Sequence, residues 1–152
     1  SVGEWPQDCY SGSLRDKYAA WRCDQITRLV RAVHAQAKQV RPGIDISAAV
    51  FGAYPSCKES VAQDWLKWIE AGYLDFVCPM NYTLDPKLFA ERAEVHRKAV
   101  PEGFPIVQGI GIASGQGQMH HPDELAVQIA LARRAGAVGF ARDQLARSVV
   151  EQ

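Results

Sequence analysis

Polar side chains able to contact a ligand gather in one short stretch, Met80-Asn81-Tyr82-Thr83. The stretch follows an apolar run, residues 74–79, that has the length and composition of a buried strand. In α/β proteins with a parallel sheet, ligands bind at the carboxyl ends of strands. Asn81 as an amide donor and Tyr82 as a phenol or stacking ring therefore predict a binding site at this strand end.

The elements that must position this stretch recur at a nearly constant interval. We expect strands over residues 44–51, 74–79, 104–112 and 137–141. Counted from Ile44, Leu74, Pro105 and Ala137, these strands recur every 30 to 32 positions. Helices are predicted over residues 14–40, 61–72, 86–100 and 122–136, with a capping box at Ser60 and Gln63 and an amino-terminal cap at Asp85. Right-handed crossovers then give four parallel strands with helices outside.

This regular period leaves two α/β folds open. An eight-stranded barrel takes about 250 residues, so the chain supplies about half of one. The alternative is a complete, small open parallel sheet of the flavodoxin type. A phosphate-binding glycine-rich loop is expected after the first strand of such a module, and Gly52-Ala-Tyr-Pro-Ser-Cys57 stands there instead, which weakens this alternative.

Composition limits the classes of protein and partner. The 152 residues are 47% hydrophobic and 22% charged, which predicts one domain over residues 1–152. Seventeen basic and seventeen acidic residues cancel, so we predict no nucleic-acid partner. No apolar run approaches the ~20 residues of a membrane helix, so we predict no membrane partner either.

Cysteine and histidine spacing argues against a metal site. The four cysteines form no C-x-x-C pair, and the adjacent His120 and His121 cannot share one metal from a helix face. We therefore predict neither a metal nor a cofactor, and Cys9 and Cys23 stay open between a disulfide and two free thiols. His96 is predicted to be a core-edge histidine with satisfied hydrogen bonds.

Residues 1–13 have no hydrophobic period and predict an irregular loop. Its aromatic residues, Trp5 and Tyr10, form either a hydrophobic plug or a platform for a sugar ring. We favour the plug.

Four segments together resemble the carboxyl-terminal half of the glycosyl-hydrolase-10-like family of bacterial (β/α)8 barrels. They are "WRCDQITRLVRAVHAQAKQVRPGIDISAAVF", "QDWLKWIEAGYLDFVCPMNYT", "VQGIGI" and "RRAGAVGF". The resemblance implies that the first long helix is the fourth of a barrel and that the strands are the fifth to the eighth. It also implies that the first four strands are absent from this chain, including the one similar to the acid-bearing strand of other sugar-cleaving barrels.

The carboxylates of this chain fit that implication. Glycoside cleavage generally uses two carboxyl groups, ~5–5.5 Å apart for retention or ~6.5–9.5 Å apart for inversion. Asp143 is the only Asp or Glu at a predicted strand end, because Asp45 and Asp75 stand at strand starts and Asp85 reads as a helix cap. We therefore expect the chain alone not to hydrolyse glycosides, and its catalytic residues stay unknown.

The resemblance implies a substrate-binding half of a glycoside-hydrolase-like barrel that acts on a polysaccharide or an oligosaccharide. The predicted substrate-binding residues are Met80, Asn81, Tyr82, Gln108 and Asp143. A non-catalytic carbohydrate-binding or scaffold domain is the alternative. Besides carbohydrate, the expected partner is the missing amino-terminal half-barrel or a second copy of the chain. The compartment stays open, with export to the periplasm or the exterior suggested by the family resemblance alone.

Overall fold

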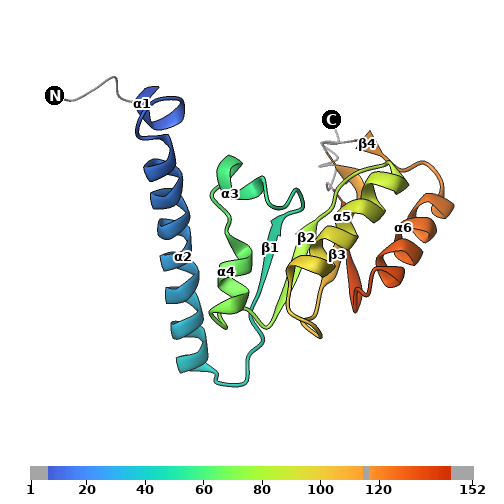
Figure 1. The fold of residues 1–152 in the computed structure, drawn as a ribbon. Coiled ribbons are helices and arrows are strands. Elements are labelled where there is room, and N and C mark those ends of the chain that lie inside the picture. The colour runs from blue at the N-terminus through green and yellow to red at the C-terminus, as the bar shows by residue number, and fades with distance from the viewer. Residues whose placement is uncertain (1–6, 115–116, 145–152) are drawn as a thin grey trace, which may run out of the picture. The chain divides into compact units, whose positions relative to one another are not determined.

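The computed structural model describes residues 7–114 and 117–144, in a mixed α/β fold (Figure 1). Contacts within the chain cluster into two compact units. We call residues up to Ser47 together with Ala53–Asp75 the helical unit, and Ala48–Gly52 together with the residues from Phe76 onwards the sheet unit. No helix in the described part of the chain is both long and apolar enough to cross a membrane.

The helical unit contains α1 (Gln7–Tyr10), α2 (Arg15–Val40), α3 (Cys57–Ser60) and α4 (Trp65–Glu70). The long helix predicted over residues 14–40 is confirmed as α2. The capping box predicted at Ser60 and Gln63 is wrong, because Ser60 ends α3 and its hydroxyl donates to the carbonyl of Ser56. Residues 7–10 form α1 inside the segment predicted to be an irregular loop, and the first six residues lie outside the described part.

Two tryptophans of α4 lie in the buried part of the helical unit. Trp65 is fully buried and Trp68 is 3% exposed. The indole Nε1–H of Trp68 donates to Oγ1 of Thr27 on α2 at 3.0 Å, so the polar edge of the ring is satisfied inside the unit. The guanidinium of Arg22 also links the helices, because it donates to the carbonyls of Glu59 and Ser60 at the end of α3.

The sheet unit is built on five strands and two helices. The strands are β1 (Ser47–Phe51), β2 (Phe76–Met80), β3 (Val107–Ser114), β4 (Gly117–Gln118) and β5 (Gly139–Gln144). The helices are α5 (Pro86–Ala99) and α6 (Pro122–Arg134). The pairs β2–β3 and β3–β5 are parallel, and the two-residue β4 is antiparallel to β3. All four predicted strands exist, although each begins two or three residues later than predicted.

The long strands follow one another across the sheet in chain order. β1 neighbours β2, and β2 neighbours β3. Gly109 of β3 pairs both with Met80 of β2 and with Ala141 of β5, so β2 and β5 must lie on opposite edges of β3. A flavodoxin-like sheet needs a reversal of strand order, and the described strands do not have one.

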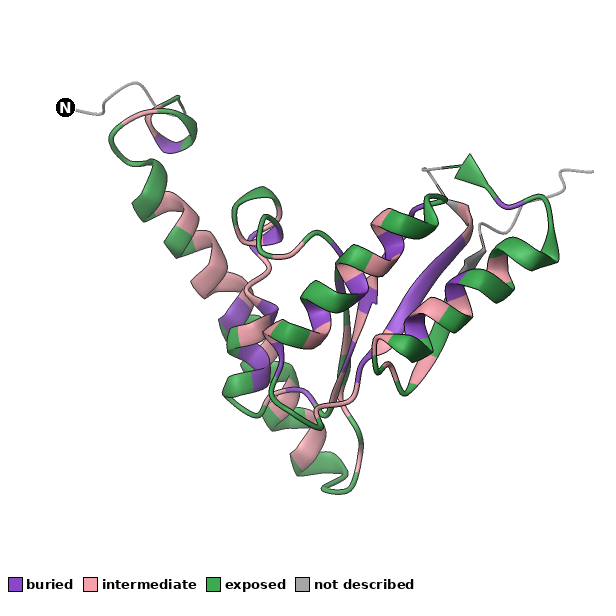
Figure 2. Ribbon diagram, turned by 45° about the vertical axis from the view of Figure 1, so that its right-hand side comes forward, coloured by how far each residue is buried: buried purple, intermediate pink, exposed green. Residues whose placement is uncertain are grey.

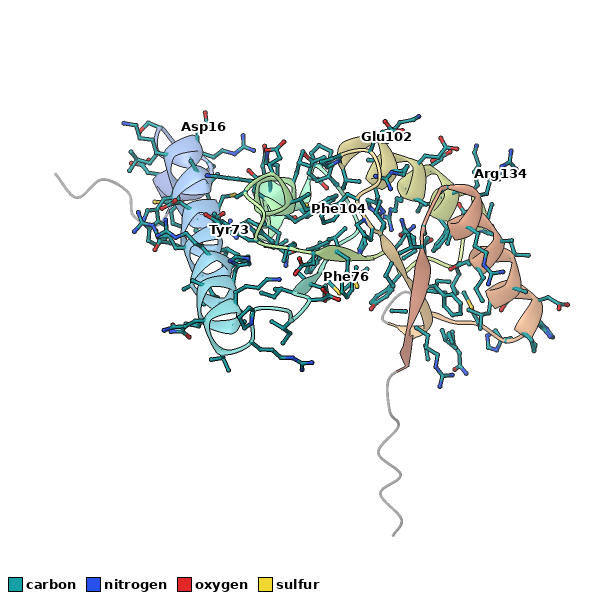
Figure 3. All side chains as sticks on the ribbon, turned by 90° about the horizontal axis from the view of Figure 1, so that it is seen from below. Asp16, Tyr73, Phe76, Glu102, Phe104 and Arg134 are labelled. Atoms are coloured by element: carbon teal, nitrogen blue, oxygen red, sulfur yellow. The ribbon has the colours of Figure 1, made fainter. Side chains whose placement is uncertain are left out.

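Helices α5 and α6 lie side by side on the same face of the sheet (Figure 1; Figure 3). The core between the helices and the sheet contains Phe89 of α5, Ala132 of α6, Ile110 of β3 and Met119, which precedes α6. Figure 2 shows the buried residues of both helices on the sides turned toward β3, with exposed residues on the opposite sides. Gln108 and Ile110 of β3, and Ile106 directly before it, are buried and alternate with residues of the other face, so they face this helical layer.

The helix starts predicted from proline are confirmed. Pro86 and Pro122 each occupy the first turn of a helix, and Oδ1 of Asp85 accepts from the backbone N–H of Lys87 at 2.9 Å. The four cysteines are free thiols in the structure, so Cys9 and Cys23 are not joined.

Candidate functional site

The turn between β2 and α5 carries the predicted site and is tightly hydrogen-bonded. The backbone N–H of Asn81 donates to the carbonyl of Pro79, and that of Thr83 donates to the carbonyl of Asn81. The hydroxyl of Thr83 accepts from the backbone N–H of Asp85 at 3.2 Å, directly before the helix cap. These bonds hold the strand end in a compact turn rather than a loose loop.

Asn81 lies behind this turn rather than on its surface. Its side chain is fully buried, and its amide nitrogen donates to the carbonyl of Phe89 on α5 at 3.0 Å. Gln128 of α6 is 1% exposed and donates to the carbonyl of Thr83 at 2.6 Å. Two buried amides therefore attach the turn to the two helices beneath it.

Gln108 belongs to the same buried layer. It is 1% exposed, and its amide nitrogen lies 3.2 Å from Nδ1 of His96, a fully buried histidine of α5. The Nε2 atom of His96 lies 2.7 Å from the carbonyl oxygen of Gly52, at the end of β1. Because a carbonyl can only accept, Nε2 carries the proton and Nδ1 accepts from Gln108. Burial lowers the pKa of His96, which keeps this tautomer neutral.

Gly52 can occupy its position only because it has no side chain. A Cβ atom there would lie 2.6 Å from the carbonyl oxygen of Met80 and 3.1 Å from the Cα of Asn81. The backbone at the end of β1 thus packs directly on the backbone at the end of β2. His96 fixes this close approach from the side of the helices.

Tyr82 and Met80 lie on the other face of the sheet. Met80 pairs in register with Gly109, whose neighbours Gln108 and Ile110 face the helices, so Met80 and Gly109 share the face without α5 and α6. A Cβ on Gly109 would lie 3.1 Å from Cε1 of Tyr82. The half-buried ring of Tyr82 therefore lies against bare backbone at the carboxyl end of the parallel strands.

Asp143 is the predicted site residue on β5. Its backbone pairs in register with Gly111, two residues beyond Gly109 along β3. It thus stands at the same end of the sheet as Met80 and Tyr82. Asp85 instead serves as a helix cap. Among the side chains that the structure describes, no group of three or more from His, Cys, Asp or Glu is arranged to hold a metal ion.

The structure divides the five predicted site residues into two groups. Met80 and Tyr82 lie together on the face of the sheet away from α5 and α6, with Asp143 at the same end of β5. Asn81 and Gln108 form the other group, in which the side-chain amides are buried and their nitrogens bond within the protein. The pattern of the strand alone cannot distinguish its two faces, since both strand faces here are rich in apolar residues.

Sequence reasoning missed Gly52 and Gln128. Gln128 does have a signal, because it stands three residues after Leu125 and four before Ala132, on the apolar stripe of α6. A polar residue on such a stripe predicts a buried hydrogen bond. Gly52 has none, because its role depends on the approach of a strand that is distant in the sequence.

A mostly parallel five-stranded sheet with a polar turn at a strand end is the arrangement of many α/β enzymes and of their inactive relatives. The model of one family, glycosyl hydrolase-like 10, matches residues 4–128, which is most of the chain. The chain therefore belongs to the glycosyl hydrolase-like 10 family. No curated protein and no solved structure matched it.

Proposed function

We propose that this chain is the substrate-binding half of a glycoside-hydrolase-like (β/α)8 barrel that acts on a polysaccharide or an oligosaccharide. The observation that carries the proposal is the position of Tyr82, whose ring lies against Gly109 at the carboxyl end of the strands. In (β/α)8 barrels this end holds the active site. Membership of the glycosyl hydrolase-like 10 family supports sugar as the ligand class.

The order of the strands supports a barrel. Parallel strands that follow one another in chain order, with successive helices on the same face, have the winding of a barrel wall. In an open doubly wound sheet the helices cover both faces. Here α5 and α6 both pack on Ile110, through Phe89 and Ala132, and so cover the same face. The face of Met80 and Tyr82 would then be the inside of the barrel.

Tyr82 suits a sugar ligand because its ring offers a flat apolar face and a hydroxyl at its edge. Met80 beside it adds an adaptable apolar contact. In this proposal Asp143 supplies a carboxylate at the same end of the sheet, while Asn81 and Gln108 support the turn from behind. Glycoside cleavage needs a second carboxyl group, which a half-barrel receives from the other half.

A non-catalytic carbohydrate-binding domain is the second candidate. It is favoured by the engagement of Asp85 as a helix cap, which leaves Asp143 as the strand-end carboxylate among the described positions. Absence of glycoside turnover together with sugar binding by the chain and its partner would select this candidate over the enzyme.

The proposed partner is the other half of a barrel, either an amino-terminal half or a second copy of this chain. β1 and β5 are the outer long strands of the described sheet, each with one long strand beside it. Phe51 of β1 is 46% exposed, and on α2 Leu29 and Val33 are 60% and 52% exposed. Unpaired strand edges and apolar surface of this kind favour association with another chain.

Calorimetric titration with glucans, chitooligosaccharides and peptidoglycan fragments tests the proposal, with the oligomeric state of the same sample measured by sedimentation velocity. We expect Tyr82→Ala to weaken binding by about tenfold or more and Tyr82→Phe by less, because the ring is kept. Tyr73→Ala, a half-buried tyrosine of the helical unit, serves as the matched control. Equal affinity of wild type and Tyr82→Ala would refute the role of Tyr82, and a monomer throughout would refute a second copy of the chain as the partner.

A further inference from the structure

The helical unit has a groove of its own along the amino-terminal half of α2. Two adjoining hollows of about 420 Å³ and about 680 Å³ lie between α2 and residues 55–67. Ala19, Ser56 and Glu59 line both of them, so the hollows form one continuous groove. Asp16, labelled in Figure 3, stands on the α2 side of it. Each volume is within the range of small-molecule binding sites.

Tyr10 and Tyr18 line one end of this α2 groove, and Trp21 lies beside them through its stacking on Tyr18. Tyr18 and Trp21 stack with their centroids 5.9 Å apart and their planes within 17° of parallel. Tyr10 meets Tyr18 edge to face at 5.5 Å. Tyr10 is 61% exposed and Trp21 is 56% exposed. Large rings that are held in place by one another and still open to solvent form a preorganised apolar surface.

The charged residues of the groove balance one another. Four basic and four acidic side chains line it: Arg15, Arg22, Lys58, Lys67, Asp16, Asp24, Glu59 and Asp64. Several are paired, with Arg15 at 2.9 Å from Glu59 and Lys58 at 3.2 Å from Asp64. A lining with no net charge has no attraction for a polyanion. It offers donors and acceptors side by side, as a ligand with many hydroxyl groups requires.

We propose that the α2 groove binds a neutral oligosaccharide, with Tyr10 in the groove and Trp21 beside it stacking on the apolar faces of sugar rings. The paired charges bond to the hydroxyl groups. This site belongs to the helical unit and does not depend on Tyr82. It gives Tyr10, at the end of α1, a role in a sugar platform, which is the alternative to the hydrophobic plug predicted from the sequence.

Titration of the full chain with cellohexaose, xylohexaose, maltohexaose and chitohexaose tests the proposal, with an oligogalacturonate as the acidic probe. We expect Trp21→Ala and Tyr10→Ala each to weaken the binding of a neutral probe by about tenfold. Both side chains are mostly exposed, so the variants keep the fold, which melting curves verify. Val40→Ala, an 86% exposed position at the other end of α2, is the matched control and should bind as wild type.

Tyr82→Ala separates this groove from the end of β2. Loss of binding in Trp21→Ala but not in Tyr82→Ala supports the groove even if the proposed function fails, and the reverse pattern supports only the end of β2. The proposal is overturned if no neutral probe binds, if Trp21→Ala and Tyr10→Ala both bind as wild type, or if the acidic probe binds more tightly. It is also overturned if Trp21→Ala changes the sedimentation coefficient instead of sugar affinity, because the rings then contact another chain.

Discussion

The two units use polar side chains in opposite ways. In the sheet unit, Asn81, His96 and Gln108 are buried and bond to backbone or to one another beneath the end of β2. In the α2 groove, Arg15 and Glu59 remain mostly exposed and bond to each other. Buried polar groups fix the backbone in place, whereas exposed charges cost little to rearrange around a ligand. The comparison indicates a rigid turn at the strand end and an adaptable surface along α2.

Two tryptophans of the helical unit differ in the same way, because one is buried and the other is exposed. Trp68 is 3% exposed and its indole N–H is bonded to Thr27, while Trp21 is 56% exposed and stacks on Tyr18. The first indole contributes to stability through burial, and the second has most of its surface available for contact. Substitutions at the two positions should therefore have different consequences.

The largest expected effect comes from the buried indole. Trp68→Ala should lower the free energy of unfolding by about 3–5 kcal/mol, because it leaves a cavity and an unpaired Thr27 hydroxyl. Trp21→Ala should change it by less than about 0.5 kcal/mol. Urea denaturation followed by circular dichroism measures both. Similar losses for the two variants would contradict the contrast between them.

A smaller effect is expected where two strand ends meet. Gly52→Ala places a Cβ 2.6 Å from the carbonyl oxygen of Met80. Relief of this clash requires a shift of the backbone, which costs more free energy than the rotation of a side chain. We expect a loss of about 1–3 kcal/mol in the free energy of unfolding. Gly43→Ala is the matched control, because nothing lies within 4 Å of its added Cβ. Chemical denaturation compares the two, and equal stability would refute the close approach of β1 and β2.

The smallest effect concerns pH. Burial lowers the pKa of His96 below 6.5, the value of an ordinary histidine, so between these values the unfolded chain binds a proton that the folded chain does not. The free energy of unfolding should therefore fall as pH drops from 6.5 toward the lowered pKa, and should gain nothing from this residue above 6.5.

Urea midpoints measured between about pH 7.5 and about pH 5 check this slope, since most carboxylates titrate lower, near pH 4. His96→Gln should flatten it. An unchanged slope in His96→Gln would mean that another group takes up the proton.

Much of the fold could be predicted because its signals are local. The helix over residues 14–40, the cap at Asp85 and the start at Pro122 depend on residues a few positions apart. Strand starts were predicted too early because the apolar runs begin before the residues that pair in the sheet. Ile46, for example, lies just outside β1, where its backbone N–H donates to the side chain of Asp75.

The site was only partly predictable, because some of its contacts join residues that are distant in the sequence. Its place at the end of β2 follows from the order of elements along the chain. Which side chains of that turn face solvent depends on α5 and α6, whose backbone and amides hold Asn81 and Thr83 from behind. The failed capping box at Ser60 has a similar cause, because that hydroxyl bonds backward within α3 rather than forward to α4.

The two hydrogen bonds that the side-chain amides of Asn81 and Gln128 donate at the turn after β2 also affect the thermodynamics and kinetics of binding. A turn attached to α5 through Asn81 and to α6 through Gln128 has already lost its conformational freedom before any ligand arrives. Binding there would carry a small entropic penalty for ordering the protein, and the association rate would be set by collision rather than by closure of a loop. Discrimination between sugars at this turn would then come from the fit of the ring to a fixed surface.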